Sequence, residues 1–219
     1  MGDYTESIMR QDAIPLHIRE CVQTEMWHGM QVSNLSKLIA REMRLSLEIW
    51  QDVEIAGILH DAGKLKLMRY LDKEESLMVE HMKYVRQHTA QSYEIIMDHG
   101  YSIKVAKSVY FHHENYDGTG YPDGLKGENI PFMARILRVC DVFVALTSDR
   151  SYRKAFDAKT AMEIMIDEVS NYDMAVFLAF QRVIHQKVMP EGVEMLKKLT
   201  SERQKIPLSV FEEEMQKMV

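Results

Sequence analysis

Apolar side chains recur at steps of three and four residues along most of the chain, a period that indicates amphipathic helices. The clearest stripe consists of Val32, Leu35, Leu38, Ile39 and Met43. Ahead of it, Pro15 suits the first turn of a helix that we expect to end at a break near residues 27–29. No segment alternates convincingly between apolar and polar residues over the length of a strand. The pattern therefore predicts an all-α protein.

Start and stop signals predict where the remaining helices lie. Ser46 suits the N-cap of a helix whose buried face ends at His60. Pro131 suits the first turn of a later helix. The expected helices span residues 46–60, 76–99, 102–113, 131–148, 160–169 and 173–184. Clustered glycines predict one long loop, and these are Gly118, Gly120, Gly124 and Gly127. We expect an N-terminal helix within 1–24, a main domain at 25–185 and C-terminal helices at 186–219 packed on it.

Composition narrows the class of protein and of partner. The chain has 219 residues, 46% hydrophobic and 27% charged, which is typical of one soluble globular core. A net charge of -6 disfavours a DNA or RNA polymer as partner. No run of 18 apolar residues and no secretion signal occurs, so we expect a cytoplasmic protein that does not bind a membrane. The two cysteines, Cys21 and Cys140, are expected to be buried thiols.

Candidate chemistry lies in polar side chains on the inward faces of five successive helices. A single inward histidine is more often a core residue bonded to a carbonyl, but a whole set is difficult to satisfy because each unpaired buried polar group costs about 1–3 kcal/mol. The set comprises His28, His60, Asp61, His88, His112, His113 and Asp141. Seven ligands exceed what one tetrahedral ion accepts, so we expect two metal ions with Asp61 as the bridge.

The donor types restrict the metal and the substrate. Imidazole with carboxylate favours iron or manganese, with nickel or zinc also suitable, and disfavours calcium or magnesium. Two divalent ions against two aspartates leave a cationic centre that would attract phosphate, and water between ions about 3.5–4 Å apart can attack phosphorus. Lys64 follows His60 by four residues and Asp61 by three, so it would lie on the same side and face an anionic substrate.

Three stretches carry a family resemblance: HDAGK at 60–64, HHENYDGTGYPDGLKGENIP at 112–131 and RILRVCDVFVALTSDRSYRKA at 135–155. Together they resemble the HD-GYP domain, the branch of the HD metallohydrolase superfamily that hydrolyses cyclic di-GMP, over about residues 25–185. The resemblance implies an HD-domain helical bundle with extra C-terminal helices and a glycine-rich segment, residues 114–131, here called the GYP loop. It implies hydrolysis of cyclic di-GMP to pGpG, or onward to GMP, by metal-bound hydroxide.

The resemblance also implies a role for each matching residue. One metal would be held by His28, His60, Asp61 and Asp141, and the other by Asp61, His88, His112 and His113. Asp61 and Lys64 would be catalytic, with Lys64 steadying the scissile phosphate. Arg150 and Arg153 would hold the second phosphate and the guanine side, and Tyr121 would form a wall of the site.

Departures from the family pattern leave alternatives open. Val144 stands in place of an aspartate, Ser151 in place of a proline, and Arg138 in place of a small residue. Some members hold a third metal through a glutamate one turn before the first histidine, where this chain has Thr24, and Glu25 is one residue off. The alternatives are hydrolysis of another cyclic dinucleotide, such as cyclic GMP-AMP, and a weakly active sensor of cyclic di-GMP.

Overall fold

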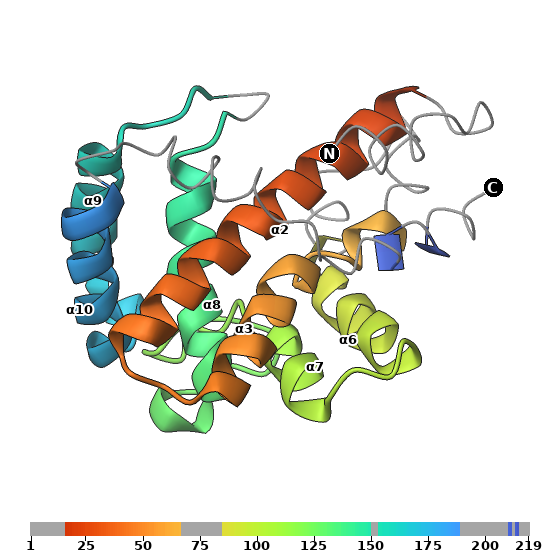
Figure 1. Cartoon of the computed structure of the whole chain (residues 1–219), viewed down its shortest axis with the longest axis horizontal. Coiled ribbons are helices and arrows are strands. Elements are labelled where there is room, and N and C mark those ends of the chain that lie inside the picture. The colour runs from red at the N-terminus through yellow and green to blue at the C-terminus, as the bar shows by residue number, and fades with distance from the viewer. Residues whose placement is uncertain (1–15, 67–84, 150–152, 189–209, 212, 215–219) are drawn as a thin grey trace.

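The computed structural model describes residues 16–66, 85–149, 153–188, 210–211 and 213–214 of the chain. All regular elements in these ranges are helices, which confirms the all-α prediction. The longer ones are α2 (Leu16–Glu42), α3 (Leu47–Leu59), α6 (His88–Asp98), α7 (Ile103–Tyr110), α8 (Phe132–Leu146), α9 (Ala158–Asp167) and α10 (Met174–Val183). Single turns are η1 (Gly127–Asn129), η2 (Val169–Asn171) and η3 (Ile184–Val188). In Figure 1, α2 crosses the molecule, with α9 and α10 at the left and α6 and α7 at the right.

The first helix corrects one expectation. The break predicted at residues 27–29 is wrong, because α2 continues through this segment for 27 residues. Gly29 serves close packing instead of ending the helix. A Cβ at Gly29 would meet the carbonyl oxygen of Ile58 at 2.5 Å, so glycine lets α3 approach α2 closely. This approach places His28 of α2 beside the end of α3.

Side-chain caps explain where several helices begin. The hydroxyl of Ser46 accepts a hydrogen bond from the backbone N–H of Ile49 at the start of α3, as its N-cap position predicted. Ser102 caps α7 in the same way. The carboxylates of Asp157 and Asp173 cap α9 and α10. These bonds satisfy amide groups that have no partner within the first helical turn.

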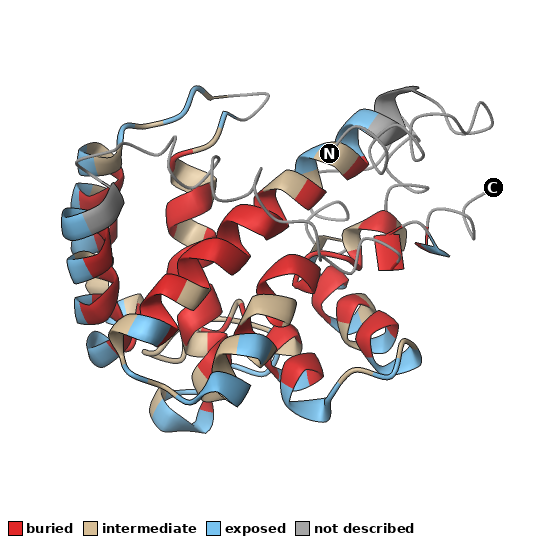
Figure 2. Cartoon of the chain, viewed as in Figure 1, coloured by how far each residue is buried: buried red, intermediate tan, exposed pale blue. Residues whose placement is uncertain are grey.

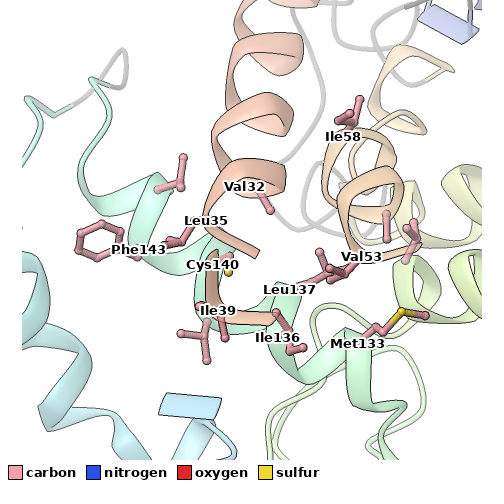
Figure 3. Close-up of a cluster of buried hydrophobic side chains, with 14 of the residues drawn as sticks. Val32, Leu35, Ile39, Val53, Ile58, Met133, Ile136, Leu137, Cys140 and Phe143 are labelled. Carbon is pink, nitrogen blue, oxygen red and sulfur yellow. The ribbon is translucent and has the colours of Figure 1, made fainter. Parts of the chain in front are cut away.

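The main core lies where α2, α3 and α8 meet. Figure 3 shows side chains of all three helices directed into one cluster, among them Leu35, Val53 and Phe143. Figure 2 shows that the inward faces of the helices are buried and that exposed residues lie on the outer faces. Cys140 is buried in this cluster as predicted, but Cys21 is exposed, so the expectation of two buried thiols is wrong for Cys21. A rigid core of this kind fixes three of the helices that carry candidate ligands.

Some expectations fall outside the described residues. The first part of the predicted helix at 76–99 lies within residues 67–84, and α6 itself begins at His88. Most of the C-terminal segment is likewise outside, although Val210 and Phe211 are buried. Within the described ranges, no helix combines the length and the apolar character needed to cross a membrane.

Candidate metal centre

The centre begins where α3 ends. His60 is the C-terminal cap of α3, and the chain then turns through residues 61–63 toward α6. Gly63 allows this turn to pass against α6, because a Cβ there would overlap the backbone carbonyl oxygen of His88. The N–H of Gly63 also donates to the hydroxyl of Ser92 at 2.8 Å. Residues 60–64 therefore place His60 and Asp61 directly beside His88.

Backbone carbonyls orient three of the imidazoles. The Nδ1 of His60 bonds to the carbonyl of Gly57 at 2.9 Å, and the Nδ1 of His112 bonds to that of Val109 at 2.6 Å. The Nδ1 of His88 makes the equivalent bond three residues back along the chain. When Nδ1 donates its proton to a carbonyl, Nε2 is left with a lone pair. In all three residues this nitrogen is directed toward Asp61.

The structure brings all seven predicted ligands together, in two groups that share Asp61. One group consists of His28, His60, Asp61 and Asp141, and the other of Asp61, His88, His112 and His113. Within each group, the ligand atoms lie within 4.8 Å of one another. Both groups are composed as the family resemblance implied.

Asp61 divides its two oxygens between the groups. Its Oδ1 lies 3.2 Å from Nε2 of His88 and 4.0 Å from Nε2 of His112. Its Oδ2 lies 3.1 Å from Nε2 of His60 and 3.8 Å from Nε2 of His28. Each carboxylate oxygen thus faces a different pair of imidazoles, which is the arrangement that a bridging ligand requires.

Unpaired buried atoms test whether metal ions suit these residues. Nε2 of His60 and Oδ1 of Asp61 are buried and form no hydrogen bond of good geometry among the described residues, although Nε2 of His60 lies 3.1 Å from Oδ2 of Asp61. These two atoms point into the two groups, and a buried polar atom with no partner costs about 1–3 kcal/mol. Coordination would satisfy both atoms, and imidazole with carboxylate is a donor set that binds divalent transition metals. The residues therefore fit a pair of such ions.

Electrostatics among the seven side chains favours negative carboxylates beside a positive group. Burial alone would raise the pKa of Asp61, but the positive charges of His60 and Lys64 hold it well below its usual value. Burial would lower the pKa of His60, but Asp61 and Asp141 raise it to about 10. Burial lowers the pKa of His113 to about 3. Protonated His60 therefore stabilises the two carboxylates, and a metal ion binding there would displace its proton.

Lys64 lies at the rim of the centre. Its Nζ donates to Oδ2 of Asp61 at 2.7 Å and to Oε2 of Glu25 at 3.1 Å. The side chain is 28% exposed, so the ammonium group borders both the centre and solvent. Of the two positions considered for a third metal, Glu25 is directed at Lys64, whereas Thr24 is exposed and donates to the carbonyl of Glu20.

The GYP loop contributes an aromatic side chain, Tyr121, beside the centre. The ring of Tyr121 stacks on that of His113, with centroids 4.8 Å apart and planes inclined by 28°. The guanidinium carbon of Arg86 lies 4.9 Å from the same ring centroid. The peptide bond between Tyr121 and Pro122 is cis. Tyr121 therefore lies directly beside one of the ligand groups.

Of the two arginines predicted to bind substrate, the structure describes only one. Arg150 lies outside the described residues. The guanidinium of Arg153 donates to the backbone carbonyls of Ala145, Leu146 and Lys154, at 2.9, 3.0 and 2.7 Å. It also stacks on Phe156. In this structure Arg153 caps the C-terminal end of α8, and its role in binding substrate stays a prediction.

Sequence reasoning overlooked Glu114, which holds the GYP loop. Glu114 is 1% exposed, and its carboxylate accepts hydrogen bonds from the backbone N–H groups of Asp123 and Leu125, at 2.8 and 3.0 Å. A signal was present, because this acid follows two inward histidines and precedes a loop whose amides have no helical partners. A buried carboxylate in such a place needs donors, and loop amides supply them.

Known proteins resemble this chain over most of its length. A cyclic di-GMP phosphodiesterase of Pseudomonas aeruginosa, PA4108, is 35% identical over 159 residues, which cover 72% of this chain and 38% of that protein. The 3'3'-cGAMP-specific phosphodiesterase 1 of Vibrio cholerae is 36% identical over 145 residues, which cover 65% of this chain and 33% of that protein. The chain therefore spans less than half the length of these relatives.

Solved structures and a family pattern agree on the fold. An HDG"Y"P protein of Bdellovibrio bacteriovorus, Bd1817, superposes with a TM-score of 0.60 at 17% identity, covering 83% of this chain and 61% of that one. The cyclic GMP-AMP phosphodiesterase V-cGAP3 of Vibrio cholerae gives a TM-score of 0.57 at 17% identity, covering 84% and 50%. The sequence pattern of the HD domain matches residues 10–176, well over half of this chain. The chain belongs to the HD domain family.

Proposed function

We propose that this chain is a metal-dependent phosphodiesterase that hydrolyses cyclic di-GMP to pGpG, or onward to GMP. The observation that carries the proposal is the pair of buried ligand groups that share Asp61, with Lys64 at their rim. A structural ion would be enclosed on all sides, whereas this centre is bordered by a lysine side chain that is 28% exposed and by the ring of Tyr121. The relatives named as cyclic dinucleotide phosphodiesterases support the substrate class.

The two ligand groups would hold one divalent ion each. Iron or manganese suits the donors best, and nickel or zinc is also compatible. Such ions, when bound, lower the pKa of water and neutralise charge on a phosphate. The carbonyl bonds of His60, His88 and His112 orient these three imidazoles so that their Nε2 atoms would be available to the ions.

Lys64 would act on the scissile phosphate. Its ammonium group now bonds to carboxylates of Asp61 and Glu25, but Oδ2 of Asp61 also belongs to a ligand group. If that oxygen held a metal ion, it would be a weaker acceptor for Lys64, and an N–H of Lys64 could then donate to a phosphate oxygen beside it. Burial would lower the pKa of Lys64, but the carboxylates of Asp61 and Glu25 raise it, so the side chain remains a cation throughout the neutral range. A fixed cation there stabilises charge that builds on phosphate oxygens during hydrolysis.

The second candidate is hydrolysis of cyclic GMP-AMP. Relatives named for that substrate match this chain at 36% and 33% identity, close to the 35% of the first cyclic di-GMP relative. The residues that bind metal would be the same for both substrates, so the choice depends on the walls of the site. Val144, which replaces an aspartate of the HD-GYP pattern, is fully buried in the core. It therefore offers no contact for telling the two nucleotides apart.

The test is a product assay on protein loaded with iron or manganese under anaerobic conditions. Cyclic di-GMP and 3'3'-cGAMP are incubated separately, and the products are resolved chromatographically. We expect cyclic di-GMP to be consumed faster and to yield pGpG first. Asp61→Asn is the matched control, because it keeps the shape of the side chain while removing its charge, and it should lose activity with both substrates. Tight binding of cyclic di-GMP without its hydrolysis would overturn the proposed enzymatic activity and would favour a sensor of cyclic di-GMP.

A second variant separates the role of Lys64 from metal binding. Lys64→Gln should reduce kcat by about a hundredfold, because a fixed charge at the transition state is worth roughly 2–4 kcal/mol. Its metal content should match that of the unmodified chain, because Lys64 is not a ligand. If kcat were unchanged, Lys64 would have no part in the reaction.

A further inference from the structure

Arg138 is a cation on α8 that the established family pattern does not contain. It lies three residues before Asp141, which places both side chains on the same face of the helix. The side chain is half-buried, and its Nε donates to Oδ1 of Asn115 at 2.9 Å. Arg138 therefore stands one helical turn from the ligand groups, held by the start of the GYP loop.

Neighbouring arginines already have protein partners, whereas Arg138 keeps free donors. Arg135 forms an ion pair with Asp173 at 2.6 Å, and Arg153 is bonded to carbonyls at the end of α8. Within the described part of the chain, Arg138 forms no ion pair, and its two terminal nitrogens bond to no protein atom. An arginine has four N–H groups on these nitrogens, arranged as a planar fork that matches two oxygens of a phosphate.

The loop keeps this fork in position. Nδ2 of Asn115 donates to the hydroxyl of Thr119 at 2.9 Å, and that hydroxyl donates to Asp117 at 2.7 Å. Asn115 is thus anchored on one side while it accepts from Arg138 on the other. An arginine that is already oriented loses less conformational entropy when it binds a ligand.

We propose that Arg138 binds the phosphate of the cyclic dinucleotide that is not being cleaved. The inference rests on the proposed function, in which the metal ions and Lys64 engage the scissile phosphate. A cyclic dinucleotide carries both phosphates on one ring, so the second stays within reach of a side chain one helical turn away. The fork of Arg138 offers paired donors at that place, and Arg153, predicted for the same phosphate, is bonded elsewhere. Arg138 thereby selects for substrates with two phosphates.

The experiment compares kinetics for two substrates. The metal-loaded full chain and its Arg138→Ala variant are assayed with cyclic di-GMP and with bis(p-nitrophenyl) phosphate, which has one phosphodiester. We expect Arg138→Ala to raise KM for cyclic di-GMP at least tenfold while kcat changes less than threefold. The rise in KM for bis(p-nitrophenyl) phosphate should be several times smaller. Arg138→Lys keeps the charge but not the paired donors, so its KM for cyclic di-GMP should lie between those of the unmodified chain and Arg138→Ala.

Asn115→Ala is the control for a merely structural role. If Arg138 only fastened the loop, Asn115→Ala and Arg138→Ala would lower activity equally, and both substrates would be affected alike. That result, or an unchanged KM in Arg138→Ala, would overturn the inference. Where Arg138→Ala melts early, Arg138→Gln takes its place, because it keeps an N–H for Asn115 and loses the charge. Failure of the unmodified chain to act on any cyclic dinucleotide would instead overturn the proposed function.

Discussion

Replacing Glu114 with alanine should release the GYP loop from the helical core. The carboxylate accepts two backbone N–H groups, from Asp123 and Leu125, and is itself buried. A hydrogen bond to a charged acceptor contributes about 1.5–3 kcal/mol. Asp123 is exposed and Leu125 half-exposed, so water can replace part of each bond in the variant. We therefore expect the loop to lose about 2–3 kcal/mol, which is at or below the lower end of the two-bond sum of about 3–6 kcal/mol.

Hydrogen exchange measures this loss where it occurs. A change of 2–3 kcal/mol corresponds to exchange of the Asp123 and Leu125 amides that is faster by roughly 30–150-fold, since about 1.4 kcal/mol is a factor of ten. Glu128→Ala is a matched control, because Glu128 is an exposed glutamate of the same loop. KM for the cyclic dinucleotide should rise in Glu114→Ala, because Tyr121 is carried by this loop. Unchanged exchange of both amides would refute the role given to Glu114.

Three further predictions concern packing, capping and pH. Gly63→Ala should lower the free energy of unfolding by about 1–3 kcal/mol, because a Cβ would overlap the backbone of His88; an equal denaturation midpoint would contradict this. Arg153→Ala should lower the melting temperature by removing bonds to three carbonyls, whereas a raised KM at an unchanged melting temperature would favour the substrate-binding role. In protein stripped of metal, His112 and His113 have pKa values below the unfolded value of about 6.5, so the unfolded state binds more protons than the folded state below that pH. The free energy of unfolding should therefore fall, as pH falls from 6.5 to 4.5, by up to about 1.4 kcal/mol per pH unit for each residue. Urea unfolding measures this change, and a free energy of unfolding that does not vary with pH would refute the prediction.

Helical period and ligand pattern were readable from the sequence because each depends on local spacing. Ser46 acts as a cap at the predicted position, and the seven candidate ligands come together as predicted. Only His28, His88 and Asp141 lie within helices, whereas the other four lie in the turns that follow α3 and α7. The course of α2 was not readable in this way, because Gly29 usually signals a helix end. Only the nearby carbonyl of Ile58 reveals that the glycine serves packing.

Side-chain partners were harder to predict than positions. Arg153 matched a substrate-binding position, yet its bonds to α8 carbonyls depend on how the chain turns after that helix. Arg138 looked like a departure from the family, and its fork became informative only once Asn115 was seen to orient it. Glu114 likewise requires knowledge of which loop amides face it. Such contacts are set by tertiary packing and leave no period in the sequence.

Metal stoichiometry of the Asp61→Ala variant tests the central claim most directly. After anaerobic loading with iron or manganese and removal of free ions, elemental analysis should find two ions in the unmodified chain. The variant should hold no more than one and should lose turnover, because Asp61 supplies one oxygen to each ligand group. Two ions and retained hydrolysis in Asp61→Ala would contradict the account.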